Sequence, residues 1–119
     1  MLSNEKYEII INKTDYGICV FAIINDRICS ADISKMGFDN TKNIYYFNRL
    51  IVPQPLRGKG VATLLMKKLI EILDIEKIIL ICEVNPYGDL NEEQLFKFYK
   101  KYGFVDDESF KSLIRFPIS

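Results

Sequence analysis

Histidine is absent from this chain of 119 residues. Without an imidazole, the chain lacks Ser-His-Asp and Cys-His nucleophile pairs, histidine metal ligands, and the side chain that most often acts as a base near neutral pH. Any acid or base chemistry therefore falls to Glu, Asp, Tyr, Lys or Cys side chains.

Cysteines are few and are not paired in the sequence. Cys19, Cys29 and Cys82 stand singly within apolar stretches, with no C-x-x-C pair and an odd total. This pattern favours a reducing compartment and thiols that fill the core, rather than disulfides or a metal site. We therefore expect no bound metal.

Net charge and long apolar runs are also lacking. Sixteen basic residues balance sixteen acidic ones, so the chain as a whole shows no footprint for nucleic acid or an anionic membrane. The longest apolar run, residues 17–24, is far shorter than the roughly 18 residues of a membrane span, and residues 1–8 are polar. We expect a soluble, cytoplasmic protein with one domain over residues 1–119, long enough to bury a core.

The first half of the chain has the composition of strands. Short turns separate four segments rich in Ile, Val, Phe and Tyr, and connections this short join antiparallel neighbours. Asn25-Asp26 is expected to be the tightest of these turns. The pattern predicts a meander of four strands over residues 7–11, 16–24, 28–34 and 44–52.

After Pro53 the apolar residues recur at helical spacing. A helix is predicted from Gly58 or Gly60 to Leu73, followed by a buried strand over residues 77–84. A strand, a helix and a strand in this order form a right-handed crossover, so the fourth and fifth strands should be parallel.

A second helix is predicted from Asn91 to Gly103. The Asn91 side chain can cap it with Gln94 as the reciprocal member of a capping box, and Leu90 can pack against Leu95. Two short strands at 104–105 and 113–116 complete the pattern. The expected fold class is α/β (α+β), with a mixed, mostly antiparallel sheet of six or seven strands and two main helices.

The segment between the fourth strand and the first helix is suited to a phosphate. The first turn of a helix has four N–H groups without internal partners and a partial positive charge. Glycines let a ligand approach, a small residue lets the helix lie close to the sheet, and mobile cations at the rim add charge. These features are supplied by Gly58, Gly60, Ala62, Arg57 and Lys59.

Three other interpretations compete for this loop, and the spacing argues against the two that are phosphate motifs. Two glycines alone also make a plain turn from strand to helix. A P-loop needs a longer span before its Gly-Lys pair, and a dinucleotide fingerprint needs a third glycine where Thr63 stands. Nucleotide binding through this loop is therefore a third, weaker class of function.

Two motifs, taken in order, resemble the GNAT superfamily of acyl-CoA-dependent N-acetyltransferases. Arg57-x-x-Gly60-x-Ala62 is similar to the coenzyme A pyrophosphate loop of that family, and F-Y-K-K-Y-G-F at 98–104 is similar to its Y-e-k-l-G-F helix end. The helix and strand between them agree as well, and the resemblance covers about residues 43–116. It implies a GNAT-like fold and transfer of an acetyl group from acetyl-CoA, as co-substrate, to a primary amine by direct attack in a ternary complex.

The resemblance also implies how acetyl-CoA would be held. Backbone groups at the end of the fourth strand would hold the pantetheine arm, main-chain amides of the loop would hold the pyrophosphate, and the second helix would add contacts. Ribosomal-protein N-terminal acetyltransferases carry an asparagine where this chain has Glu92, one position after Asn91. The implied residues are Leu50, Ile51 and Val52 for the arm, Arg57, Gly58, Lys59, Gly60, Val61, Ala62 and Thr63 for the pyrophosphate, and Asn91 and Tyr99 from the second helix.

Attack of an amine on a thioester needs a base, an oxyanion donor and an acid for the departing thiolate. Glu83 is the candidate base, acting directly or through water, and its strand resembles that of ribosomal-protein N-terminal acetyltransferases, whose matching glutamate is the base. Tyr99 is the candidate acid because a phenol with a pKa of about 10 stays protonated at neutral pH. Tyr102 and Tyr87 are alternative candidates should Tyr99 not be the acid.

Each candidate also has a plainer interpretation. A strand glutamate such as Glu83 is commonly an exposed surface residue, and Tyr99 can simply belong to the apolar stripe of an amphipathic helix. A main-chain amide of Leu50 or Ile51 is the expected oxyanion donor.

The front of the chain departs from the family pattern. GNAT proteins usually place two helices between the first and second strands, and here only residues 12–15 intervene. Their loss is compatible with an open site for a protein terminus or side chain, with a site completed by a second subunit in a homodimer, or with a reduced domain for a small amine. The competing function is a non-catalytic acyl-CoA-binding sensor or interaction module with the same fold.

Overall fold

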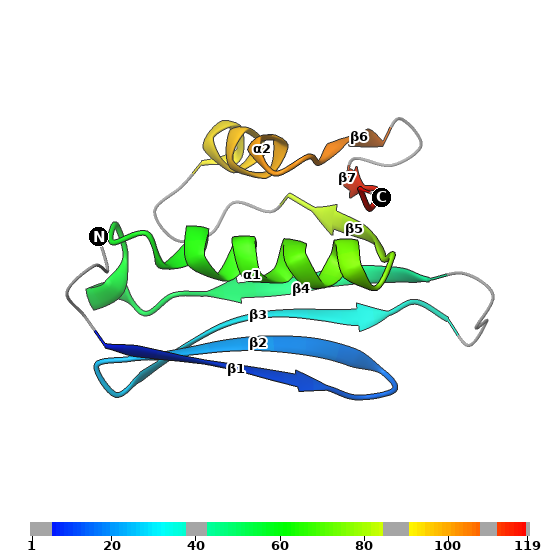
Figure 1. Ribbon diagram of the computed structural model, residues 1–119. Helices are drawn as coiled ribbons and strands as arrows, with labels where there is room; N and C mark the ends of the chain where they lie inside the picture. Colours follow the sequence, from blue (N-terminus) through cyan, green and yellow to red (C-terminus); the bar gives the residue numbers. More distant parts are fainter. Residues whose placement is uncertain (1–5, 38–42, 85–90, 108–111, 119) are drawn as a thin grey trace.

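The computed structural model describes residues 6–37, 43–84, 91–107 and 112–118. Within these ranges the chain forms seven strands, one short 3-10 turn and two α-helices (Figure 1). The elements in chain order are β1 (Tyr7–Lys13), β2 (Gly17–Ile24), β3 (Arg27–Lys35), β4 (Ile44–Ile51), η1 (Gln54–Leu56), α1 (Val61–Ile75), β5 (Ile79–Glu83), α2 (Glu92–Lys101), β6 (Val105–Asp107) and β7 (Ser112–Arg115).

The strands make one sheet in the order β1-β2-β3-β4-β5-β7-β6. β1 to β4 pair as antiparallel neighbours, β4 and β5 are parallel, and β7 is antiparallel to both β5 and β6. The predicted fold class is thus confirmed, with α1 as the crossover between the two parallel strands. Residues 14–16 alone join β1 to β2, so the short front of the sequence is also short in the fold.

Local sequence signals explain where the elements turn and end. Asn25 and Asp26 both have positive φ, of 51° and 62°, which is the backbone of the tight hairpin turn that matches strand twist. The first helix runs two residues past the predicted Leu73, and β5 begins later than predicted. Lys77, with φ 58°, follows the helix in the left-handed conformation and reverses the chain before the strand can start.

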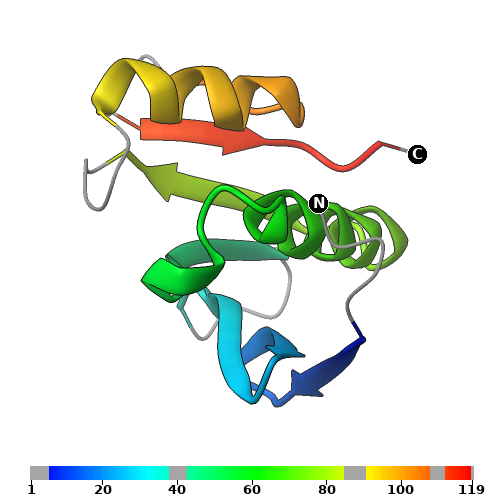
Figure 2. The ribbon, with the colours of Figure 1, turned by 90° about the vertical axis from the view of Figure 1, so that its left-hand side faces the viewer.

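The core lies between α1 and one face of the sheet. Alternate residues of β2 and β3 are buried on this face, and α1 packs against both strands. Figures 1 and 2 show α1 running along this face and α2 lying beside β6 and β7 at the far end. The largest core side chains include Ile18, Ile24, Ile33, Leu65, Leu69, Leu73 and Leu80.

The start of α2 follows its sequence signal closely. Asn91 is the N-cap: its Oδ1 accepts from the Gln94 N–H at 2.9 Å, and its own N–H donates to Gln94 Oε1 at 2.9 Å. The predicted capping box is confirmed. Leu90 lies outside the described residues. None of the described helices is both long and apolar enough to cross a membrane.

One partly buried ion pair joins both helices to the C-terminal strand. Arg115 on β7 is 2% exposed, and its guanidinium donates to both Asp74 carboxylate oxygens, at 2.9 and 3.2 Å. Its Nε donates to the Tyr102 carbonyl at 2.8 Å, and Asp74 also accepts from the Ile118 N–H. This contact holds the end of α2 against the end of α1.

Candidate active site

A gap opens where the two parallel strands stop pairing. The β4–β5 register ends at Tyr46 and Ile81, yet β4 continues to Ile51 and β5 to Glu83. On its other side β4 stays paired with β3, but the register shifts between Ile33 and Asp32. One β4 residue is extra at this bulge, which bends and twists the strand.

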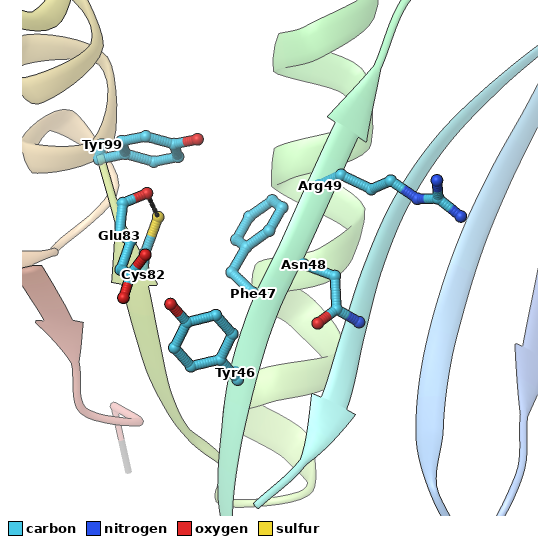
Figure 3. A pocket seen from close by; sticks show the side chains of 7 residues that line it. All are labelled: Tyr46, Phe47, Asn48, Arg49, Cys82, Glu83 and Tyr99. Carbon is cyan, nitrogen blue, oxygen red and sulfur yellow. Dashed lines mark hydrogen bonds between the residues drawn. The ribbon is translucent and has the colours of Figure 1, made fainter. Parts of the chain in front are cut away.

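A cavity of about 140 Å³ occupies this gap (Figure 3). Both predicted catalytic candidates line it, Glu83 from β5 and Tyr99 from α2. The structure therefore brings together two residues from different elements. The other lining residues were not predicted; they are Tyr46, Phe47, Asn48 and Arg49 from β4 and Cys82 from β5.

Aromatic contacts hold the Tyr99 ring in place. The ring is 5% exposed and meets Phe47, Phe98 and Phe104 edge-on, at centroid distances of 6.0, 5.6 and 5.4 Å. Such contacts fix the ring plane as well as burying its area. Figure 3 shows the hydroxyl directed toward β4, across the gap. Tyr99 thus belongs to the apolar stripe of α2 and also presents a hydroxyl to the cavity.

The thiol beside Tyr99 is protonated at neutral pH. Burial raises the pKa of Cys82 to about 12; hydrogen bonding from Tyr99 lowers it, and the charge of Glu83 raises it. Cys82 Sγ also lies 3.5 Å from the Glu83 carbonyl oxygen. A protonated thiol is a weak nucleophile. Cys82 therefore serves as a small, polarisable side chain that lines the cavity.

The carboxylate of the cavity faces a second phenol. Glu83 is exposed at the end of β5, and Figure 3 shows the Tyr46 hydroxyl pointing across the gap toward it. Burial, hydrogen bonding to Glu83 and the nearby Glu83 charge together raise the pKa of Tyr46 to about 12. The phenol is therefore a donor at neutral pH.

The remaining β4 side chains turn toward β3. Asn48 Nδ2 donates to Asp32 Oδ2 at 3.0 Å and to Ser34 Oγ, and Arg49 Nε donates to Asp32 Oδ1 at 3.3 Å. Two successive polar residues interrupt the alternation of an otherwise apolar strand. That interruption is the sequence signal for the bulge and for this wall of the cavity.

The loop before α1 leaves open space at the helix start. Gly60 is the N-cap of α1 with φ 82°, and as a glycine it has no side chain of its own to cap the helix. A Cβ added at Gly58 or Gly60 would have no heavy atom within 4 Å among the described residues. Arg57 was expected to be mobile at the rim, but its Nε donates to the Val52 carbonyl at 2.9 Å and closes the loop. Open space and an uncapped helix start are what a bound diphosphate requires.

The other sequence candidates lie elsewhere or serve local structure. The Asn91 carboxamide oxygen is engaged in the cap of α2. Tyr102 does not line the cavity, and its hydroxyl is buried with no partner in the described part of the chain. Tyr87 lies outside the described residues. Across those residues no group of three or more His, Cys, Asp or Glu side chains is suited to a metal ion.

A family model for the acetyltransferase (GNAT) domain matches residues 15–106. The chain belongs to the GNAT acetyltransferase family. A search of the curated proteins found no significant match to this GNAT chain.

Two solved structures share its fold. Ard1 from Thermoplasma volcanium superposes with a TM-score of 0.65 at 18% identity, over 85% of this chain and 71% of that one. A GNAT-family protein from Desulfovibrio desulfuricans superposes with a TM-score of 0.59 at 16% identity, over 83% of this chain and 67% of that one. The splayed strands and the glycine loop described above are therefore parts of a GNAT fold.

Proposed function

We propose that this chain is an N-acetyltransferase that moves an acetyl group from acetyl-CoA to a primary amine by direct attack in a ternary complex. The observation that supports this most strongly is the cavity at the β4–β5 gap, which gathers a carboxylate, Glu83, and a phenol, Tyr99, in one place. The strand that forms its wall, β4, is followed by η1 and then by the open helix start at Gly60.

The loop residues fit the diphosphate of the donor. Main-chain N–H groups at an uncapped helix start present donors and a partial positive charge to an anion. Backbone groups at the end of β4, beyond its last pair with β5, would hold the pantetheine arm. The proposed set is Arg57, Gly58, Lys59, Gly60, Val61, Ala62 and Thr63 for the diphosphate, Leu50, Ile51 and Val52 for the arm, and Asn91 and Tyr99 at the second helix.

In the proposed reaction the amine nitrogen forms a bond to the acetyl carbon, and the bond from that carbon to sulfur breaks. Glu83 accepts the amine proton, directly or through water, and Tyr99 gives a proton to the departing thiolate. A main-chain amide of Leu50 or Ile51 would stabilise the oxyanion. A lysine amine is about one part in a thousand neutral at pH 7.4, whereas an α-amino group with a pKa of about 8 is much more readily neutral, so the base matters most for lysine.

Titration calorimetry with acetyl-CoA and with coenzyme A tests donor binding first. A thiol-release assay across a panel of amines and peptides then tests transfer. Binding together with release supports the enzyme. Tight binding without release across the whole panel supports the sensor or interaction module, and ATP or NAD affinity that acetyl-CoA does not displace supports a nucleotide site.

The acceptor class is decided by its products. The short β1–β2 connection is compatible with an open site that takes a protein terminus or side chain. It is also compatible with a shortened domain that takes a small amine. Incubating the protein with a cell extract and labelled acetyl-CoA, followed by mass spectrometry, distinguishes acetylated proteins from acetylated small amines.

A further inference from the structure

We propose that Tyr46 is a positioning residue, whose hydroxyl donates to the Glu83 carboxylate and holds it at the β4–β5 gap in the orientation that accepts the amine proton. This inference rests on the proposed function, in which Glu83 is the proton acceptor. It assigns Tyr46 a role that acts through Glu83.

The strand register places the two side chains on one face. Tyr46 is the last β4 residue paired with β5, opposite Ile81, and Glu83 stands two residues further along β5. Because side chains two residues apart on a strand share a face, Glu83 projects on the same side as Tyr46. Phe47 and Cys82 are buried on the other side, with the Tyr99 ring packed against Phe47.

Glu83 needs such a contact because its own strand ends there. Its backbone is paired with Ser112 of β7, but it has no partner on β4, and its side chain is exposed. A long, exposed carboxylate side chain has many accessible rotamers, and fixing one of them costs conformational entropy. Tyr46 is half-buried, so its ring is held by the fold and can hold the carboxylate in turn.

Because the Tyr46 phenol is protonated, it is the donor in its hydrogen bond with Glu83. The pKa of Tyr46 is raised to about 12, first by burial and then by Glu83 itself, so the phenol donates at any working pH. A carboxylate has about four lone-pair sites, so one bond from Tyr46 leaves sites for an amine proton or a water. The other polar groups of this wall, Asn48 and Arg49, are bound to Asp32.

Tyr46→Phe removes the hydroxyl and keeps the ring. A hydrogen bond to a charged group contributes about 1.5 to 3 kcal/mol, so we expect kcat to fall about 10- to 100-fold while the acetyl-CoA Kd measured by calorimetry changes less than about twofold. Tyr45→Phe is the matched control, because Tyr45 is the neighbouring tyrosine, buried on the opposite face. It should leave kcat unchanged.

A double-mutant cycle separates positioning from a merely structural role. In a Glu83→Gln background, Tyr46→Phe should cause no further loss of kcat, because its effect passes through the carboxylate. Glu83→Asp keeps the carboxylate but withdraws it by one methylene, and it should lose a similar factor, again without addition from Tyr46→Phe. This second pair gives the answer even if Glu83→Gln folds poorly or is too slow to measure.

The outcomes are distinguishable from failure of the proposed function. If the wild-type protein releases no thiol with any acceptor, the acetyltransferase assignment fails and this inference fails with it. If the wild type is active and Glu83→Gln is impaired, but Tyr46→Phe keeps the full rate or multiplies the Glu83→Gln loss, the inference alone is overturned.

Discussion

At the scale of single residues, the cavity places protonated side chains beside the Glu83 carboxyl group. The pKa values of Tyr46 and Cys82 are both raised to about 12, so both groups carry their protons at neutral pH. Among the described residues that line the cavity, Glu83 alone carries a carboxylate. This arrangement supports the proposed assignment of Glu83 as the proton acceptor.

Tyr99→Phe tests the proposed acid. The ring contacts with Phe47, Phe98 and Phe104 remain, so the variant should fold, but the proton for the thiolate is gone. Since general acids contribute about 10²-fold or more, we expect kcat to fall by about that factor with nearly unchanged acetyl-CoA affinity by calorimetry. Tyr102→Phe, which removes a hydroxyl outside the cavity, is the control. Equal rates for wild type and Tyr99→Phe would remove Tyr99 from the mechanism.

Cys82 should resist alkylation in the native protein. Its side chain is 2% exposed and its pKa is about 12, so the thiolate that attacks an alkylating reagent is scarce at pH 7.5. Iodoacetamide treatment followed by peptide mass spectrometry should show Cys82 unmodified in the native chain and modified after denaturation in urea. Ready modification of Cys82 in the native protein would contradict the buried, protonated state.

At the scale of elements, one turn and one bulge create the site. The start of α1 at Gly60 leaves open space for an anion, and the extra β4 residue bends that strand where β5 leaves it. The bulge also shifts which face the following β4 residues occupy, so Leu50 pairs opposite Ala31 toward the core while Ile51 remains exposed.

Gly60→Glu tests the anion site at the start of α1. The new side chain would enter open space and place a carboxylate where the diphosphate is proposed to bind, so acetyl-CoA affinity should fall more than about 100-fold. Both this variant and Gly37→Glu carry about 1 to 2 kcal/mol of strain from positive φ. Gly37, with φ 70° and equally open space, is therefore a matched control for stability.

Calorimetry and thermal unfolding are compared for the two glycine variants. Gly37→Glu should lose similar stability and keep its acetyl-CoA affinity. A folded Gly60→Glu protein that binds acetyl-CoA normally would place the diphosphate elsewhere.

At the scale of the whole molecule, the Arg115–Asp74 pair keeps both helices on the sheet. Asp74 lies near the C-terminus of α1, and Arg115 lies on β7. The Arg115 guanidinium also donates to the Tyr102 carbonyl at the end of α2. Because Tyr99 and its cavity depend on where α2 lies, this distant ion pair supports the site.

Asp74→Asn should destabilise the fold, with a pH dependence of known sign. The Arg115 hydrogen bond lowers the pKa of Asp74, against burial and with help from the Ile118 N–H and nearby cations. The stabilisation is therefore present above the unfolded pKa of about 3.9 and is lost as pH falls through the lower folded value. Leaving Arg115 buried without its carboxylate should cost about 3 kcal/mol at pH 7.

Urea unfolding at several pH values checks this. The difference between wild type and Asp74→Asn should be full at pH 7 and shrink below about pH 4, where Asp74 of the unfolded wild-type chain takes up a proton before Asp74 of the folded chain does. A difference that stays constant from pH 7 to pH 3 would show that the pair does not stabilise through its charge.

Much of the fold followed from the sequence because its signals are local. The Asn25-Asp26 turn, the capping box at Asn91 and the glycine loop before α1 each depend on residues within a few positions of one another, and each is present in the structure. The change from strand to helix period likewise predicted the crossover between β4 and β5. The predicted end of α1 and the predicted start of β5 were less accurate, because the left-handed conformation of Lys77 has no strong sequence signal.

The sequence by itself therefore determined the element order, the parallel pair and the two candidates Glu83 and Tyr99. Only the tertiary structure decided that these two share a cavity with Tyr46 and Cys82, and that Arg115 reaches Asp74. Those contacts depend on where β4 and β5 stop pairing and on how two helices pack, and both are set by segments more than 30 residues apart, such as Tyr46 and Glu83. Spacing along the chain carries no signal for such distances, because close approach across a sheet is fixed by packing rather than by local conformation.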